Sequence, residues 1–131
     1  MSLQDQAAFL SNIHPFQVLT AGQMDNCIRH MDIAYYPKDS ILISPEKISK
    51  HFFIIIKGSV YEYSADNIVV MDYHQEDSFD SNSLIYSKCN NTFKVHEELI
   101  CYEIEKDTFL NLIEKNQQFK DYFLKDLVNK K

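Results

Sequence analysis

The fold of this chain is decided by residues 32–77, whose sequence is DIAYYPKDSILISPEKISKHFFIIIKGSVYEYSADNIVVMDYHQED. β-Branched and aromatic residues gather there in short runs, separated by turn residues about every 8 to 12 positions, a spacing typical of all-β sandwiches and barrels. The predicted strands are Ile33 to Tyr36, Ser40 to Ile43, Phe52 to Ile56, Ser59 to Tyr63 and Ile68 to Tyr73. Tight turns are predicted at Lys57-Gly58 and over residues 65–67. No helical period separates these runs, so we expect an antiparallel sheet.

Helical patterns flank this region on both sides. The first helix is predicted from Leu3 and closes at Ser11-Asn12. The second begins at Thr20, which stands at capping-box spacing from Gln23. After the sheet, helical spacing of Phe and Leu returns over residues 106–131.

Two further strands are predicted between the sheet and the last helices, over residues 92–95 and 99–104. The predicted fold class is therefore mainly β with flanking helices. We expect an antiparallel β-roll, of the double-stranded β-helix or jelly-roll kind, with about eight strands. A single domain is expected, with helices over 1–31, the roll over 32–104 and helices over 106–131.

The composition argues against nucleic acids and anionic membranes as binding partners. The chain has 131 residues and a formal net charge of −6, so it repels phosphate backbones and anionic membranes, and no direct nucleic acid partner is expected. Its three cysteines have no metal-type spacing, which favours a reducing compartment, and we expect the cytoplasm. No apolar segment approaches the length of a membrane span.

Residue patterns for metal binding or catalysis are also missing. The five histidines are scattered singly, so no metal site is predicted. Only Gly22 and Gly58 are available to build phosphate-cradling loops, and no nucleophile motif is present. We expect no catalytic residue, and the chain is predicted not to be an enzyme.

The whole layout resembles the cyclic nucleotide-binding domain family, the ligand-sensing β-roll of catabolite-activator-type regulators and regulatory kinase subunits. The likeness covers nearly the whole chain. It is carried by PFQVLTAGQMDNCIRHMDIAYYPKDSILISPEKISKHFFIIIKGSVYEY, by EDSFDSNSLI, and by EELICYEIEKDTFLNLIEKNQQFKDYF. FLSNIHPF, YYPKDSILI, ICYEI and FKDYF are most similar to the domains that precede CBS modules and a nucleotidyltransferase in bacterial signalling proteins. That likeness implies that the chain is part of a longer polypeptide.

Residues 77–92, DSFDSNSLIYSKCNNT, stand where the resemblance places the phosphate-binding cassette. The family's cassette has a Gly after the Phe, then a Glu for the ribose hydroxyl, a short helix, and an Arg for the cyclic phosphate. The candidate ligand-binding residues here are Phe79, Asp80, Ser81, Asn82, Ser83, Leu84, Lys88, Asn90, Asn91 and Thr92. Without the resemblance, the same stretch is interpreted as a solvated loop.

The cassette departs from the family's pattern. Asp80 takes the Gly place and Ser81 the Glu place, and the Arg position falls near Cys89 or Asn90, which leaves Lys88 as the nearest cation. Losing the charge-assisted pair costs about 2 to 5 kcal/mol, or a factor of about 30 to several thousand in affinity. The family's turn glycines are replaced in a similar way, by Asp39, Asp66-Asn67 and Glu76. Asp and Asn tolerate positive φ comparatively well, so the fold is expected to survive.

Four functional hypotheses follow. The leading one is a regulatory domain with a diverged cassette, which binds another small ligand or acts through adjacent domains, with its output through the C-terminal helices. The second is true cyclic nucleotide sensing, and a cyclic nucleotide or another small anion is the one candidate ligand. The third is the sensor part of a Crp/Fnr-type transcription regulator that lacks its DNA-binding part. The fourth is a homodimer formed through the C-terminal helices, where exposed Phe119, Tyr122 and Phe123 would make an apolar patch.

Overall fold

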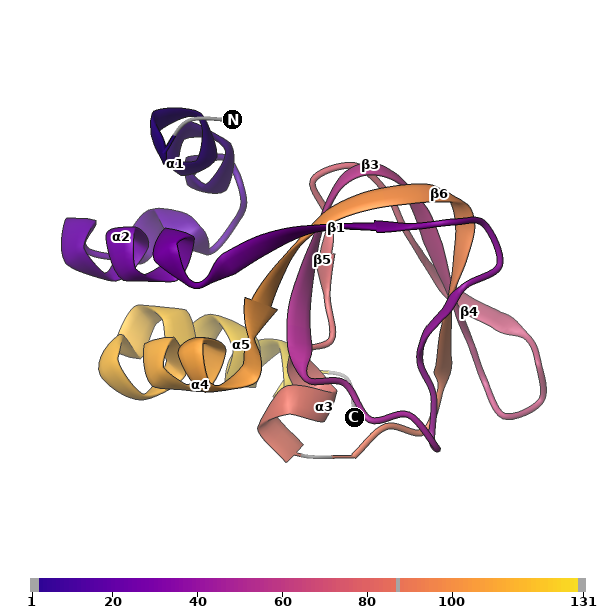
Figure 1. Ribbon diagram of the computed structural model, residues 1–131. Coiled ribbons are helices and arrows are strands. Elements are labelled where there is room, and N and C mark those ends of the chain that lie inside the picture. The colour runs from indigo at the N-terminus through magenta and orange to yellow at the C-terminus, as the bar shows by residue number, and fades with distance from the viewer. Residues whose placement is uncertain (1–2, 87, 130–131) are drawn as a thin grey trace. The chain divides into compact units, whose positions relative to one another are not determined.

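The structure of the chain is a computed structural model that describes residues 3–86 and 88–129, with side chains at 5–80, 84–86 and 88–124. The chain forms two compact units (Figure 1). One unit joins the N-terminal segment up to Met31 to the C-terminal segment from Ile104, and the other is Asp32–Glu103. Within the described residues, each helix falls short of the length and apolarity that crossing a membrane requires.

The first unit is helical. Its elements are α1 (Leu3–Ser11), η1 (Phe16–Val18), α2 (Ala21–Arg29), α4 (Lys106–Lys115) and α5 (Gln117–Asn129). The predicted first helix and the predicted start of the second are confirmed. The region after residue 105, predicted to form helices, contains α4 and α5 with a break at Asn116.

The predicted capping box at the start of α2 is confirmed. The backbone N–H of Gln23 donates to Thr20 Oγ1 at 3.1 Å, and the backbone N–H of Thr20 donates to Gln23 Oε1 at 3.0 Å. Asn116 extends this network, because its Nδ2 donates to Gln23 Oε1 and to the carbonyl of Val18, both at 3.0 Å. Its Oδ1 accepts from the N–H of Phe119 at 3.0 Å, which caps α5. One polar cluster thus fixes the ends of three helical elements.

Four phenylalanines form the aromatic core of the helical unit. The Phe119 ring lies 5.3 Å from Phe16, 5.9 Å from Phe109 and 5.0 Å from Phe123, between centroids. Phe119 is fully buried and Phe123 is 6% exposed, whereas Tyr122 is 41% exposed. The predicted apolar patch on the last helix is therefore wrong for both phenylalanines, because they pack edge to face within their own unit.

The second unit is a roll of antiparallel strands. These strands are β1 (Met31–Tyr36), β2 (Ile41–Ile43), β3 (His51–Tyr63), β4 (Val69–Tyr73), β5 (Ser78–Phe79) and β6 (Thr92–Glu105). The sheet order is β1-β6-β3-β4, with β2 paired to β6 and β5 paired to β3. Figure 1 shows β1, β3 and β6 arching round a common interior. The fold class predicted from the sequence, mainly β with flanking helices, is confirmed.

The number of strands and one turn were predicted wrongly. The sheet has six strands rather than about eight, because the runs at 52–56 and 59–63 form one strand, as do those at 92–95 and 99–104. Lys57-Gly58 is not a turn but lies inside β3. Gly58 has φ +102°, and a Cβ there would lie 2.1 Å from the Glu98 carbonyl oxygen. Glycine is needed at that point for close approach of two strands, not for a chain reversal.

Four residues other than glycine have positive φ in the described structure: Asp39 (73°), Asn67 (62°), Glu76 (72°) and Asp80 (85°). Each stands where the family resemblance places a glycine, so the backbone keeps the left-handed conformation after the glycine is lost. Such conformations cost a non-glycine residue on the order of 1 kcal/mol each, and Asp and Asn tolerate them best. The expectation that the turns survive is confirmed.

The interior of the roll is filled by apolar side chains from all of its long strands. They are Leu42, Ile43, Phe53, Ile55, Val60, Phe79, Phe93, Val95, Leu99 and Cys101. Ala34, Tyr36, Tyr73 and Cys89 are half-buried against this cluster. The candidate cassette therefore lies against a packed core.

Candidate functional site

The candidate cassette begins as strand and continues as helix. Strand β5 pairs with β3, with Phe79 opposite Phe53. Asp80 follows with positive φ, and α3 (Ser81–Tyr86) begins at the next residue. The short helix that the resemblance implies is thus present, and it begins at Ser81.

Phe79 is stacked among other aromatic rings. Its ring is nearly parallel to those of Phe53 and Phe93, with centroids 5.0 Å and 5.3 Å away, and Tyr73 lies 5.1 Å away. Its exposed fraction is 4%. Phe79 thus fills the roll interior with the protein's own rings.

The interpretation of residues 77–92 as a solvated loop is therefore wrong for the part from Phe79 to Leu84. Phe79, Asp80 and Leu84 are all buried. The reason is that β5 and α3 carry this segment along the sheet, where an apolar face must be covered. Lys88 and Asn90 are exposed to solvent, as the loop interpretation predicted.

A carboxylate from β3 lies beside the cassette. The hydroxyl of Tyr73 donates to Glu62 Oε1 at 2.7 Å, and Nδ2 of Asn91 donates to Glu62 Oε2 at 2.7 Å. Asn91 comes directly after the positions at which the resemblance places the phosphate-binding arginine. The Tyr73 hydroxyl and the Asn91 side-chain amide are therefore both hydrogen-bonded to a carboxylate of the protein itself.

Negative charge accumulates around this carboxylate. Burial raises the pKa of Tyr73 above its usual range, and its hydrogen bond to Glu62 and the charges of Glu62, Asp77 and Asp80 raise it further. Burial also raises the pKa of Cys89, as do the charges of Asp80 and Glu62, while a hydrogen bond to the backbone of Asn91 lowers it. Two separate groups thus sense the same pair of carboxylates, Glu62 and Asp80.

Positive charge is scarce within the cassette sequence. Lys88 is exposed and is the one cation of residues 77–92. The one arginine of the whole sequence, Arg29, belongs to α2 in the helical unit and pairs with Asp25 at 3.1 Å. The side chains of Ser81, Asn82 and Ser83 lie outside the described residues. The cassette sequence therefore has no guanidinium that could form bidentate hydrogen bonds with a phosphate.

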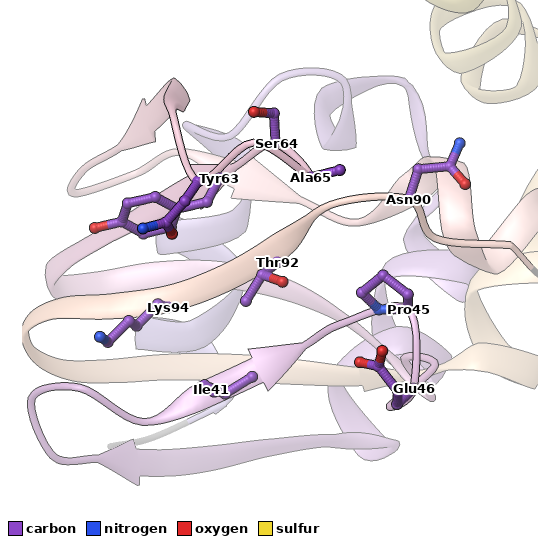
Figure 2. Close-up of a pocket in the computed structure, with 10 residues that line it drawn as sticks. Ile41, Pro45, Glu46, Tyr63, Ser64, Ala65, Asn90, Thr92 and Lys94 are labelled. Atoms are coloured by element: carbon purple, nitrogen blue, oxygen red, sulfur yellow. The ribbon is translucent and has the colours of Figure 1, made fainter.

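The last candidate residues, Asn90 and Thr92, line a different space. They line an open pocket of about 540 Å³ together with Lys94, Tyr63 and Glu46, and Figure 2 shows these residues. Its walls come from β2 and the segment after it, from the β3–β4 turn, and from the start of β6. The ten predicted site residues are therefore not brought together, because some face the roll interior and others face this outer pocket.

Glu62 was not among the residues predicted from the sequence. A signal for it exists, since Glu62 stands two positions after the buried Val60 in β3 and alternation places both on one face. A charged residue at such an inward position is unusual and marks a polar contact. The pairing of Glu62 with Asn91, 29 residues away, depends on the sheet register.

Among the described residues, no group of three or more His, Cys, Asp or Glu side chains is arranged to hold a metal ion. The carboxylates around Glu62 are instead bound by neutral donors from Tyr73 and Asn91. Nothing in this geometry resembles the charged oxygen cage that a hard cation needs.

Residues 33–116 match the sequence profile of the cyclic nucleotide-binding domain, from β1 to the end of α4. This chain belongs to the cyclic nucleotide-binding domain family. Domains of this family are regulatory, and the six-stranded roll with α3 after β5 agrees with the predicted family. A search of curated proteins found no match to this cyclic nucleotide-binding domain.

Solved structures share the fold at low sequence identity. The sensor domain of the transcriptional regulator DNR from Pseudomonas aeruginosa superposes with a TM-score of 0.83 at 14% identity, covering 95% of this chain and 91% of that one. The regulatory domain of Toxoplasma gondii PKA with cAMP gives 0.85 at 16% identity, covering 97% of this chain and 50% of that one. A protein from Geobacter metallireducens gives 0.76 at 14% identity, covering 98% of this chain and 94% of that one.

The three thiols of this cyclic nucleotide-binding domain are expected to differ in reactivity. Burial raises the pKa of Cys27 and of Cys101 to about 12, and both are fully buried, while Cys89 is half-buried beside the cassette. Iodoacetamide at pH ~8 should therefore alkylate Cys89 well before the other two. Mass spectrometry of timed samples measures this, and urea-unfolded protein, in which all three should react alike, is the control. Equal rates in the folded protein would contradict the described burial.

Proposed function

We propose that this chain is a regulatory domain whose cassette has diverged, so that it does not hold cyclic AMP or cyclic GMP tightly. The observation that carries the proposal is the Glu62 carboxylate, which accepts hydrogen bonds from both Tyr73 and Asn91. A bound cyclic phosphate would compete for these donors.

Electrostatic magnitudes support this proposal. Two like charges about 4 Å apart repel by roughly 4 kcal/mol at an effective dielectric constant of about 20. A phosphate in the roll interior would meet Glu62 and the buried Asp80, with no arginine to compensate. One such repulsion alone lowers affinity by about a thousandfold.

The regulatory signal is then another small ligand or a contact with adjacent domains of a longer polypeptide. The likeness to domains that precede CBS modules and a nucleotidyltransferase supports the second route. The domain itself carries out no reaction in this proposal, and it works in the cytoplasm. Its output passes through the helices that follow the roll.

Genuine cyclic nucleotide sensing is the second candidate. It is favoured by one observation, the short helix α3 that directly follows Phe79 and Asp80. A helix start of this kind presents backbone N–H groups, which suit a phosphate.

Calorimetric titration of the protein with cyclic AMP and cyclic GMP separates the two candidates. We expect no saturable heat in the micromolar range with either nucleotide, because of the repulsions described above. Dissociation constants below about 10 μM, which correspond to about 7 kcal/mol of binding free energy, would overturn the diverged-cassette proposal. The Glu62→Gln variant serves as the comparison, because it removes the charge and keeps the shape, and it should bind at least as well as the natural protein.

A further inference from the structure

We propose that the edge of β4 binds a short, extended segment of another protein, apolar along its length and basic at both ends, as an added strand. The part of the edge that meets this segment is the run from Ile68 to Met71, called the β4 edge below. This inference goes beyond the proposed function and stands without it, because it concerns the outer edge of the sheet rather than the cassette.

Strand β4 lies at one end of the sheet. The sheet order is β1-β6-β3-β4, and within the described residues β4 pairs with β3 alone. Figure 1 shows β4 in a hairpin at the outer side of the roll. On the side away from β3, alternate residues of such a strand present backbone N–H and C=O groups to solvent. A further strand would bind to these groups.

The β4 edge is apolar and exposed. Its members are four consecutive large apolar side chains, each between 45% and 61% exposed: Ile68, Val69, Val70 and Met71. Edge strands of soluble proteins often carry Lys or Pro, which discourage pairing with another chain. Strand β4 contains neither, and its one charged side chain is Asp72. An exposed apolar run of this length is characteristic of a contact surface.

The apolar side chains lie on both faces of the hairpin. Met71 pairs with Glu62, and Val69 pairs with Tyr63. Directly paired residues point to the same face, whereas the neighbours Glu62 and Tyr63 point to opposite faces. Val69 and Met71 are therefore on opposite faces of the sheet. A flat partner laid on one face would cover only part of the β4 edge, whereas a strand placed alongside would contact both faces.

The register of β3 and β4 limits the length of the partner. It shifts between Glu62 and Tyr63, so Val70 has no direct partner on β3. A bulge of this kind increases the local twist of the strand. Strand β4 is five residues long, which corresponds to about 17 Å at roughly 3.3 Å for each residue. The expected partner is thus a short segment rather than a whole sheet.

Charge identifies the partner as basic. Residues 58–87 contain six acidic residues and no Lys or Arg, whereas the rest of the chain has thirteen residues of each sign. Asp72 is paired with His74 at 3.0 Å, but Asp66 and Glu76 are exposed just beyond the two ends of β4. Lys or Arg side chains at both ends of a bound segment would therefore meet opposite charge, whichever direction the segment runs.

The same charge argues against a second copy of this chain as the partner. Two β4 edges brought together would place two acidic segments side by side, with no Lys or Arg in either segment to compensate. Like charges at an interface suppress association. A basic segment brings its own cations and meets no such repulsion.

The test is a nitrogen–proton NMR titration of the protein with the peptide KKVTVTVKK, capped at both ends. Its alternating valines supply the apolar side chains, and its lysines supply the charge. We expect saturable shifts of the backbone amides of Val69, Val70 and Met71, with half-saturation below ~2 mM peptide. Hydrogen exchange at the outward-facing amides of β4 should become slower when the peptide is bound.

Two control peptides separate the contributions of charge and of backbone pairing. EEVTVTVEE keeps the apolar pattern and reverses the charge, so it should bind at least ~10-fold more weakly. KKVTPTVKK keeps the charge, but its central proline has no N–H to donate, so most of the binding should be lost. Equal binding of either control peptide would overturn the inference.

Matched variants locate the contact on the protein. Val70→Lys places a cation in the β4 edge and should weaken KKVTVTVKK at least ~5-fold. Ile48→Lys adds the same charge at a residue about as exposed but outside β4, and should bind the peptide like the natural protein. Asp66→Asn should weaken the peptide about two- to fivefold, as expected for an exposed ionic contact.

Several outcomes would overturn the inference. One is the absence of any saturable shift up to ~5 mM KKVTVTVKK, and another is unchanged binding in Val70→Lys. Shifts that gather at Leu84 and Asn91 would assign the peptide to the cassette instead. Shifts of the β4 amides on dilution of the protein without peptide would assign the β4 edge to a second copy. Tight cyclic AMP binding would overturn the proposed function and leave this inference standing.

Discussion

Alanine in place of Gly58 is expected to lower the free energy of unfolding by about 2 to 6 kcal/mol. A Cβ at this position would lie 2.1 Å from the carbonyl oxygen of Glu98 and 3.0 Å from that of Glu97. Both obstacles are backbone atoms of β6, which cannot swing aside as a side chain can. Overpacking of this kind costs about 1 to 3 kcal/mol, and the positive φ of Gly58 adds about 1 to 3 kcal/mol more for alanine.

Gly22→Ala is the matched control for this experiment. Gly22 lies in α2 without a positive φ, and the nearest atom to an added Cβ is Thr20 Oγ1 at 4.0 Å. Alanine there should be neutral or stabilise the protein by up to about 1 kcal/mol, because it favours the helix. Urea unfolding followed by circular dichroism measures both variants. Equal stabilities for the two would contradict the close approach of β3 and β6.

Truncation of Phe79 to alanine is expected to cost about 3 to 5 kcal/mol of unfolding free energy. Its ring stacks between Phe53 and Phe93 and touches Tyr73, so its loss leaves a cavity in the roll interior. Removal of a fully buried aromatic ring is among the most destabilising substitutions in a core.

Tyr86→Ala is the control that shows whether any truncation of an aromatic side chain in residues 77–92 lowers the free energy of unfolding. Tyr86 ends α3 and is 60% exposed, so its truncation should change stability by only about 0.5 kcal/mol. The same urea titration compares the two variants, with Phe79→Leu as an intermediate case that keeps part of the volume. A cost below about 1 kcal/mol for Phe79→Ala would mean that the segment is a solvated loop after all.

Local signals in the sequence predicted much of the fold. Strand runs, the Thr20 capping box and the break after Ser11 follow from neighbours within a few positions, so spacing alone revealed them. Gly58 was misassigned to a turn because a glycine after a lysine has the local signature of one. Glycine is required at position 58 because the backbone of Glu98 lies against it. Glu98 is 40 positions away in the sequence and comes close only in the folded sheet.

The candidate site was predicted less completely than the fold. The family resemblance implied a short helix after Phe79, and α3 is present there, directly after Asp80 with its positive φ. The contact between Glu62 and Asn91 could not be predicted, because it depends on which residues of β3 and of the segment before β6 face each other. The separation of buried Phe79 and Asp80 from Asn90 and Thr92, which line the outer pocket, has the same origin.

In the proposed function, the protein's own Glu62 carboxylate holds the donors that a cyclic phosphate would need. The side-chain amide signal of Asn91, whose Nδ2 is 2.7 Å from Glu62, reports on this contact directly. Nitrogen–proton NMR spectra recorded with increasing cyclic AMP, up to ~1 mM, are the measurement. We expect the Asn91 side-chain signal and the Phe79 and Asp80 amides to stay in place. A saturable shift of these signals at micromolar cyclic AMP would contradict the account.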